Sequence, residues 1–396
     1  MTRLVFWLAG AAVAWSYGAF PTVLALRGLL LRRPHREADV TPTVSVIVAA
    51  HNEAGVIERK VRSVLEQDYP PDRLSVLVAS DGSDDGTPAA VTALGSPKVR
   101  VLDLPRVGKA AALQAAADVA DGEILVFSDA NSILAQDAVR RLVRPFADPA
   151  VGGVAGNQVY VKGDDPHAIA VGERSYWDFD RFLKQAQTRA GNITQGTGAL
   201  YALRRSLFRP IPADVNDDFF ESLAVVAAGR RLVFAPDAVA YERVAPSRAL
   251  EYGRRVRIMT RGLRCVFSVP GVLDPRRTGF YAVQLFTHKI LMRVMAVPLA
   301  AVAITSALLW PRGLVYRLAA IGQAAFYGLA AAGLALAGRP ASHRPWLALP
   351  AYFSMIQLAS LHATWNLLTG RSYVSWRTDR DRALAEPPAN PLPEAA

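Results

Sequence analysis

Two kinds of apolar run follow one another along the chain. From residue 43 to about residue 242, short runs rich in Val, Ile and Leu alternate with longer stretches of helical periodicity. The short runs are "TVSVIVAA", "LSVLVAS", "VRVLDL" and "EILVFSD", and the helical stretches include "EAGVIERKVRSVLE" and "KAAALQAAADVA". Continuous apolar strands separated by helices are typical of a parallel sheet that is covered on both faces. The pattern predicts a doubly wound, Rossmann-like α/β domain over residues 33–245.

Longer apolar runs flank this domain. Residues 4–31 contain a single charged residue, Arg27, and the run is longer than the roughly 7–15 residues of a signal-peptide core. Since about 20 apolar residues cross a bilayer as a helix, residues 1–32 are expected to form an uncleaved transmembrane helix. Further apolar runs lie at 283–310, 318–337 and 346–368. A buried core helix is the alternative for any single run, but four runs favour a membrane protein with about four transmembrane helices, three of them within residues 283–370.

Basic residues next to the apolar runs indicate the orientation. Arginines follow the first run directly, which places the α/β domain in the cytoplasm by the positive-inside rule. Residues 246–282 mix arginine with apolar side chains and are expected to lie on the membrane surface as an amphipathic segment. Residues 371–396 form a polar, partly disordered tail. Three spans after a cytoplasmic domain place this tail outside, whereas its arginines favour the inside, and the sequence leaves both open. We expect a multi-pass protein of the inner or plasma membrane.

Composition narrows the class of partner. The chain is 52% hydrophobic and carries a net charge of +11. Because many of the arginines lie beside apolar runs, anionic membrane lipids explain the charge better than nucleic acid, which we do not expect as a partner. The one cysteine, Cys265, excludes an intrachain disulfide and a cysteine-cluster metal site.

Polar and acidic residues end three of the expected strands. Asp81 follows "LSVLVAS", Asp129 follows "ILVFS", and His51, Asn52 and Glu53 follow "VIVAA". Acids at strand ends often cap the next helix. However, in an open α/β sheet ligands bind beyond the carboxyl ends of the strands, and three such ends favour a ligand site.

The order of the short motifs adds a resemblance to a known family. The motifs are "VSVIVAAHNE", "SDGSDDGT", "GKAAAL", "FSDANS", "GTGALYALRR", "NDDFFESLAVVAAGRRLVFAPDAVAYE" and "RRVRI". Their order resembles the family 2 inverting glycosyltransferases, and especially the membrane-anchored group with the poly-N-acetylglucosamine, cellulose and hyaluronan synthases. The resemblance covers residues 40–260 approximately. It implies a GT-A fold and transfer from a UDP-sugar to a saccharide or lipid-linked acceptor, in the synthesis of a cell-surface polysaccharide or glycolipid.

The resemblance also assigns residues to the donor. Those it places at the nucleotide sugar are His51, Asn52, Glu53, Asp81, Lys109, Asp129, Arg254 and Arg257. Ser80 stands where the family commonly has the first of two acids, and Asp81 keeps the second. The alternative for Lys109 is an ordinary lysine at the start of a helix.

Asp129 matches the first acid of the family's Asp-x-Asp metal motif, and Asn131 stands at the second position. A divalent cation that bridges diphosphate oxygens stabilises the charge that develops on the leaving group. Mg²⁺ and Mn²⁺ prefer oxygen ligands, which an asparagine carbonyl also supplies, but without a charge. We therefore expect Mg²⁺ or Mn²⁺ at Asp129 and Asn131, held more weakly than by two acids. The alternative is that Asn131 only caps a helix.

The family's general base is the last residue of a Thr/Gly-Glu-Asp triplet, which aligns with Asn216, Asp217 and Asp218. Asp218 is therefore expected to take the proton of the acceptor hydroxyl, and Asp217 to contact the acceptor or to cap the helix. An acidic helix cap alone is the alternative. The resemblance places Thr197, Gly198 and Ala199 at the floor of the acceptor site.

One departure bears on the product. Where processive relatives carry Gln-x-x-Arg-Trp, this chain has Arg254, a retained Arg257 and Ile258. The missing aromatic platform disfavours synthesis of long chains. The alternatives are a single-sugar transferase to a polyprenyl or glycerol lipid, and a non-catalytic scaffold of a polysaccharide-export complex.

Overall fold

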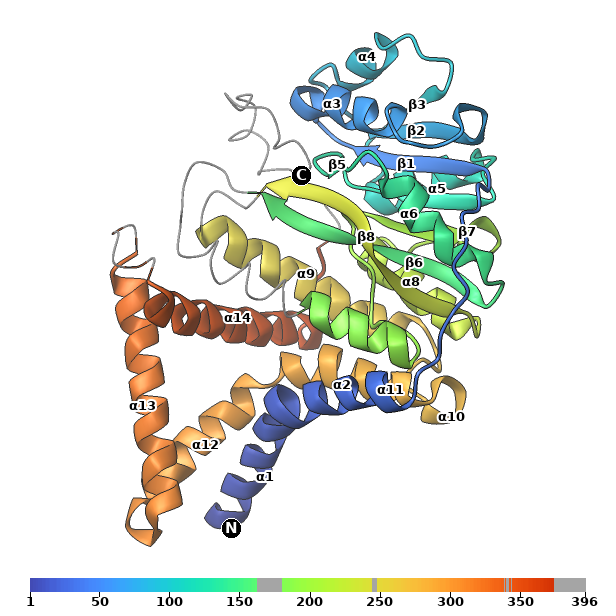
Figure 1. Ribbon diagram of the computed structural model, residues 1–396. Coiled ribbons are helices and arrows are strands. Elements are labelled where there is room, and N and C mark those ends of the chain that lie inside the picture. Colours follow the sequence, from blue (N-terminus) through green and yellow to red (C-terminus); the bar gives the residue numbers. More distant parts are fainter. Residues whose placement is uncertain (162–179, 244–247, 338, 340–341, 343, 374–396) are drawn as a thin grey trace.

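The computed structural model consists of an α/β domain and a group of helices that extends away from it (Figure 1). The structure describes the whole chain apart from residues 162–179, 244–247, 338, 340–341, 343 and 374–396.

The α/β domain contains an eight-stranded sheet in the order β3-β2-β1-β4-β7-β6-β8-β5. The strands are β1 (Val44–Ala50), β2 (Leu74–Asp81), β3 (Val99–Leu104), β4 (Ile124–Phe127), β5 (Ile133–Leu134), β6 (Val151–Val161), β7 (Tyr201–Arg204) and β8 (Arg231–Arg243). The first four are parallel, as predicted. However, β7 is antiparallel to β4 and β6, and β5 is antiparallel to β8. β6 and β8 are parallel to each other, so the sheet is mixed, and the prediction of a parallel sheet was wrong only for β7 and β5. An apolar run indicates that a strand is buried on both faces of the sheet. Such burial occurs in parallel and antiparallel strands alike, so the run does not predict strand direction.

Helices cover both faces of the sheet, so the doubly wound layering is confirmed. The helices of one face are α3 (Ala54–Leu65), α4 (Thr87–Thr92) and α6 (Ala138–Val143), and those of the other are α5 (Lys109–Asp118) and α8 (Asp217–Ala227). Alternate residues of β1 show the division, because Val46 and Val48 pack with α3 whereas Ile47 and Ala49 pack with α5.

The second of these cores continues into the C-terminal helices. Those helices are α9 (Arg248–Ser268), α10 (Pro275–Thr278), α11 (Phe280–Leu285), α12 (Ala296–Leu308), α13 (Leu314–Ala335) and α14 (Pro345–Leu368). Cys265, Val266, Tyr281 and Leu285 belong to the same buried cluster as Phe219 of α8. The Tyr281 hydroxyl also donates a hydrogen bond of 2.8 Å to the carbonyl of Thr194.

The apolar helices are fewer than the sequence predicted. Within the described residues, two are long and apolar enough to cross a membrane: Thr2–Leu30, which is α1 (Thr2–Ala14) and α2 (Phe20–Leu30) joined by one π-helical turn, and Leu314–Ala335. A third results if Phe280–Arg293 and Ala296–Leu308, which meet at a bend of 61°, count as one span. The predicted span at 346–368 forms α14, which is not among them. This helix carries polar side chains such as Gln357 and Asn366, which are buried in the protein. The count of about four is thus not supported.

Candidate functional site

The predicted site residues gather where β1, β2 and β4 end and where α5 and α8 begin. Lys109 is the first residue of α5, and Asp217 is the first residue of α8. The Lys109 ammonium lies 2.8 Å from Asp129 Oδ1 and 3.1 Å from Asp217 Oδ2. Burial alone would lower the pKa of Lys109, but the two carboxylates outweigh it and raise the pKa above its usual value. The Lys109 ammonium therefore lies between Asp129, the predicted metal ligand, and Asp217, a predicted acceptor residue.

Asp218 follows in the first turn of α8. Burial, together with the negative charges of Asp217 and Asp129, raises the pKa of its carboxyl to about 7, although Lys109 opposes the shift. Its Oδ1 accepts a hydrogen bond of 2.8 Å from the amide of Phe219. A general base works best when its pKa lies near the working pH, so Asp218 has the ionisation that base catalysis requires.

The predicted acceptor segment packs directly against Asp129. The amide of Asp129 donates to the carbonyl of Gly198 at 3.0 Å, and Ser128 Oγ donates to the carbonyl of Ala199 at 2.5 Å. A Cβ on Gly198 would lie 2.8 Å from Asp129 Oδ2, so a larger residue here would displace the Asp129 carboxylate. The antiparallel pairing of β4 with β7, which begins at Tyr201, produces the contact.

Asp81 binds the loop that leads into α5. It is fully buried, and its carboxylate accepts hydrogen bonds from Arg106 (2.7 Å) and from the amides of Val107 (2.6 Å) and Gly108 (2.8 Å). His51 Nδ1 lies 2.8 Å from the Asp81 carbonyl oxygen. Asp81 thus fixes the approach to Lys109.

Two other residues of the predicted nucleotide site lie at the end of β1. Asn52 adopts a left-handed conformation, with φ of 56°, and its Oδ1 accepts from the amide of Asp84 at 3.0 Å. Glu53 is buried, and its amide donates to Thr87 Oγ1 at 2.9 Å. These contacts join the end of β1 to the loop that follows β2.

Helix α9 borders the site from the side of the C-terminal helices. Asn216 Nδ2 donates to the carbonyl of Ile258 at 3.0 Å, which attaches the start of α8 to α9. Arg254 Nε lies 3.1 Å from Glu251 Oε2, and a second Arg254 nitrogen lies 3.4 Å from the Tyr160 hydroxyl. Arg257 lies one helical turn beyond Arg254 and is half-buried.

A family model for "Glycosyl transferase family 2" matches residues 45–211, which contain β1 to β7 and the Asp129 loop. The chain carries a glycosyl transferase family 2 domain. The family predicted from the motif order is thereby confirmed.

Known proteins similar to this chain agree with that domain. An N-acetylglucosaminyltransferase of Rhizobium sp. (strain N33) is 29% identical over 300 residues, which cover 70% of this chain and 66% of the relative. A beta-monoglucosyldiacylglycerol synthase of Synechocystis sp. is 28% identical over 210 residues, which cover 49% of this chain and 43% of the relative. The chain therefore spans about two thirds of the first relative and less than half of the second.

A solved structure extends the likeness to the fold. The mannosyltransferase PcManGT from Pyrobaculum calidifontis, in complex with GDP-Man and Mn²⁺, matches with a TM-score of 0.68 and 28% identity, over 93% of this chain and 100% of its own. The predicted GT-A fold is thereby confirmed, with the mixed sheet described above.

The donor set of the family 2 domain fits a hard divalent cation. No group of three or more His, Cys, Asp and Glu side chains gathers as a ready-made metal site in the part of the chain that the structure describes. Asp129 and Asn131 offer oxygen atoms only. Mg²⁺ is commonly held in this way, by one or two carboxylates together with substrate phosphates and water, and Mn²⁺ shares its preference for oxygen ligands.

Sequence reasoning missed two residues that contact the loop of Asp129 and Asn131. Lys60 of α3 is fully buried and donates to Ser128 Oγ (2.5 Å) and to the Ser132 carbonyl (2.6 Å). Burial lowers the pKa of Lys60 to about 7, against the charge of Asp129. Lys60 lies on the apolar stripe of its helix, three residues after Ile57, and that position could have signalled it. The other missed residue is Glu242, whose amide partner is Asn131.

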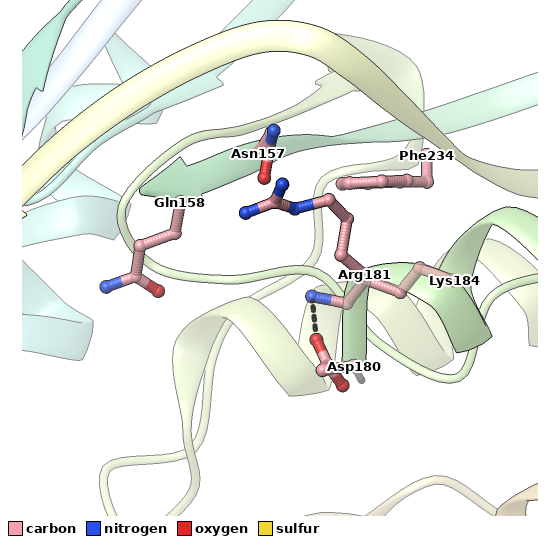
Figure 2. Close-up of a pocket in the computed structure, with 6 residues that line it drawn as sticks. All are labelled: Asn157, Gln158, Asp180, Arg181, Lys184 and Phe234. Carbon is pink, nitrogen blue, oxygen red and sulfur yellow. Dashed lines mark ion pairs between the residues drawn. The ribbon is translucent and has the colours of Figure 1, made fainter. Parts of the chain in front are cut away.

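A small polar pocket lies beside the acceptor segment. Its lining is Asn157, Gln158, Asp180, Arg181, Lys184 and Phe234 (Figure 2). Lys184 Nζ lies 2.8 Å from Asp180 Oδ2, and Gln158 Oε1 accepts a hydrogen bond of 2.7 Å from Thr197 Oγ1. The pocket is thus connected to the predicted acceptor floor through one side chain.

Proposed function

We propose that this protein is an inverting glycosyltransferase that moves a sugar from a nucleoside diphosphate sugar to a saccharide or a lipid-linked acceptor. The observation that carries the proposal is the contact of Lys109 with both Asp129 and Asp217. This contact brings the loop that carries Asp129 and Asn131, here called the cation-binding loop, next to the acids at the start of α8. A donor diphosphate at the loop then lies within reach of an acceptor at Asp218.

In the proposed reaction, the Asp218 carboxylate takes the proton of the acceptor hydroxyl. The acceptor oxygen attacks the anomeric carbon as the bond from that carbon to the diphosphate oxygen breaks, and the nucleoside diphosphate leaves on the opposite side. Lys109 places a positive charge beside the departing phosphates. A bound divalent cation would supply further stabilisation of that negative charge.

The donor is proposed to be a UDP-sugar, on the strength of the motif resemblance. The structural neighbour was solved with GDP-Man, so both nucleotides need to be tested. Detergent-purified protein is incubated with a panel of UDP-sugars and GDP-sugars in Mn²⁺, and release of the nucleoside diphosphate is measured. We expect release from at least one donor. If a folded protein releases neither UDP nor GDP from any donor, with saccharide and lipid acceptors present, the scaffold alternative replaces the proposal.

Transfer of a single sugar to a lipid is the second candidate. It is supported by Ile258, which leaves the start of α8 without an aromatic platform, and by the similarity to a glucosyldiacylglycerol synthase. The pocket of Figure 2 adds Arg181, a guanidinium of the kind that binds phosphate, whereas Lys184 is paired with Asp180. Mass analysis of the product with lipid and saccharide acceptors distinguishes the two candidates.

We further propose three membrane crossings, with α14 on the membrane surface. Figure 1 shows α1 and α12 extending away from the α/β domain toward the lower end of α13, while α14 runs from the upper part of α13 back toward the domain. Phe6, Leu309 and Tyr316 form a cluster at the distant end. This arrangement supports a path that leaves the cytoplasm at α12 and returns at α13.

The contacts of the residues that follow α14 support the same path. Arg264 donates to the carbonyl of Arg371 at 3.0 Å, and Arg261 lies 3.4 Å from the carbonyl of Tyr373. Arg261 Nε also donates to the carbonyl of Val215, directly before α8, at 3.0 Å. Residues 371–373 would then be cytoplasmic together with the catalytic site, which agrees with the arginines of the tail.

Cysteine labelling tests this path. In a Cys265→Ala background, single substitutions Ser96→Cys and Ser372→Cys should both be protected from a membrane-impermeant maleimide in intact cells and should react after permeabilisation. Arg312→Cys, between α12 and α13, should react in intact cells and serves as the control. Labelling of residue 372 from outside would disprove the surface position of α14, and labelling of residue 96 would disprove the cytoplasmic domain.

A further inference from the structure

Asn131 is held in one orientation by an acid from a distant strand. Its Nδ2 lies 3.3 Å from Oε1 of Glu242. An ionised carboxylate only accepts hydrogen bonds, so the amino side of the amide must face Glu242. The carbonyl oxygen of Asn131 therefore faces away from Glu242 and is kept available as a ligand.

The sheet fixes this encounter. Strand β5 pairs with β8 in antiparallel register, with Ile133 opposite Tyr241 and Leu134 opposite Ala240. One step further along each strand brings Ser132 and Glu242 to the same level, directly beside Asn131. Because the partner position is set by backbone pairing, the contact does not depend on the conformation of a free loop.

A second amide holds the other side of the carboxylate. Glu242 is 4% exposed, and its Oε2 accepts a short hydrogen bond from Gln158 Nε2. Gln158 in turn accepts from Thr197 Oγ1 at 2.7 Å. The amides of Asn131 and Gln158 therefore hold the two oxygens of this carboxylate in place.

We propose that Glu242 completes the cation-binding loop of this protein as a positioning residue. It orients the carbonyl oxygen of Asn131 so that this oxygen can serve the cation. The inference rests on the proposed function and names the residue that serves the divalent cation. It also links the loop, through Gln158, to Thr197 of the predicted acceptor floor.

The inference is tested by exchanging the amide of residue 131 and the carboxylate of residue 242. Glu242→Gln removes the charge and allows the Asn131 amide to turn, whereas Asn131→Asp with Glu242→Gln restores one carboxylate and one amide in exchanged positions. Mn²⁺ affinity is measured from the electron paramagnetic resonance signal of free Mn²⁺, in the presence of UDP and separately of GDP. We expect Glu242→Gln to weaken Mn²⁺ binding by about tenfold, since loss of an outer partner of a ligand typically costs 10–100-fold. The double variant should return to within about threefold of wild type.

Two further variants serve as controls. Glu123→Gln removes an acid from the opposite end of the sheet, where it lies 3.5 Å from Arg204, and should leave Mn²⁺ affinity unchanged. Asn131→Asp alone brings two carboxylates face to face, and we expect it to have a lower melting temperature than the double variant. If Glu242→Gln does not fold, the double variant still carries the test, because it retains both the charge and the hydrogen bond.

The outcomes separate this inference from the proposed function. Wild-type Mn²⁺ affinity in a folded Glu242→Gln protein would overturn the inference, and so would a double variant that binds as weakly as the single one. A wild-type protein that binds no Mn²⁺ with either nucleotide would overturn it as well. Normal Mn²⁺ binding without nucleoside diphosphate release from any donor would instead refute only the proposed catalysis.

Discussion

Asp218→Asn should lower turnover by about 10²–10⁴-fold, the usual contribution of a general base, while affinity for the nucleoside diphosphate stays nearly unchanged. The asparagine keeps the size and the hydrogen bond to the Phe219 amide but cannot accept the proton of the acceptor. Nucleoside diphosphate release gives the turnover, and calorimetry gives the affinity. Near-normal turnover by the folded variant would remove Asp218 from the proposed mechanism.

The adjacent acid provides the matched control. Asp217→Asn should retain much more turnover than Asp218→Asn, because Asp217 does not act as the base. It should also shift the pH profile in a known direction. A base is active once deprotonated, so kcat/KM should rise with pH around the pKa of Asp218. The negative charge of Asp217 helps to raise that pKa to about 7. Without that charge the midpoint of the rise should move to lower pH. A shift to higher pH would contradict the assignment.

Asp129→Ala should abolish sugar transfer at every concentration of Mn²⁺ or Mg²⁺. Asp129 is the only acid in the 128–132 loop, and no added metal can restore a missing ligand. The substitution also removes the nearer of the two acids paired with Lys109. The measurement is nucleoside diphosphate release as a function of metal concentration, with EDTA for the wild type.

A surface acid serves as its control. Asp137, which pairs with Arg141 at 2.9 Å on α6, is 42% exposed, and Asp137→Ala should leave the metal dependence unchanged. Full wild-type activity in EDTA, or an Asp129→Ala variant with the activity and metal dependence of the wild type, would show that Asp129 does not serve a cation.

Three of the four strands that the sequence predicted, β1, β2 and β4, are buried on both faces, whereas β3 is partly exposed. β1, β2 and β4 are continuous apolar runs, and burial alone makes such runs recognisable. The direction of β7 was missed because it depends on how the chain returns to the sheet, which no local pattern records. The count of about four spans is unsupported for a related reason, which concerns α14. Its composition is close to that of a membrane span, and its packing against α9, through contacts such as Ser360 with Met259, could not be read from the sequence.

The candidate site divides in the same way. The motifs predicted Lys109, Asp129, Asp217 and Asp218, and the structure brings these four together. Their mutual contacts could not be predicted, since they depend on where α5 and α8 begin relative to the end of β4. Glu242 lies 111 residues from Asn131, and only the register of β5 against β8 makes them neighbours.

The core shared by the sheet and the C-terminal helices limits how this protein can be divided for study. A fragment that stops at residue 245 would lose Cys265, Val266, Tyr281 and Leu285, and would expose Phe219 directly after the catalytic acids. Removing buried apolar side chains of this size costs several kcal/mol each. Such a fragment would therefore tend to aggregate, and its inactivity would say nothing about the chemistry. Recombinant work should keep α9 to α11 attached, so that the smallest useful unit already includes helices that approach the bilayer.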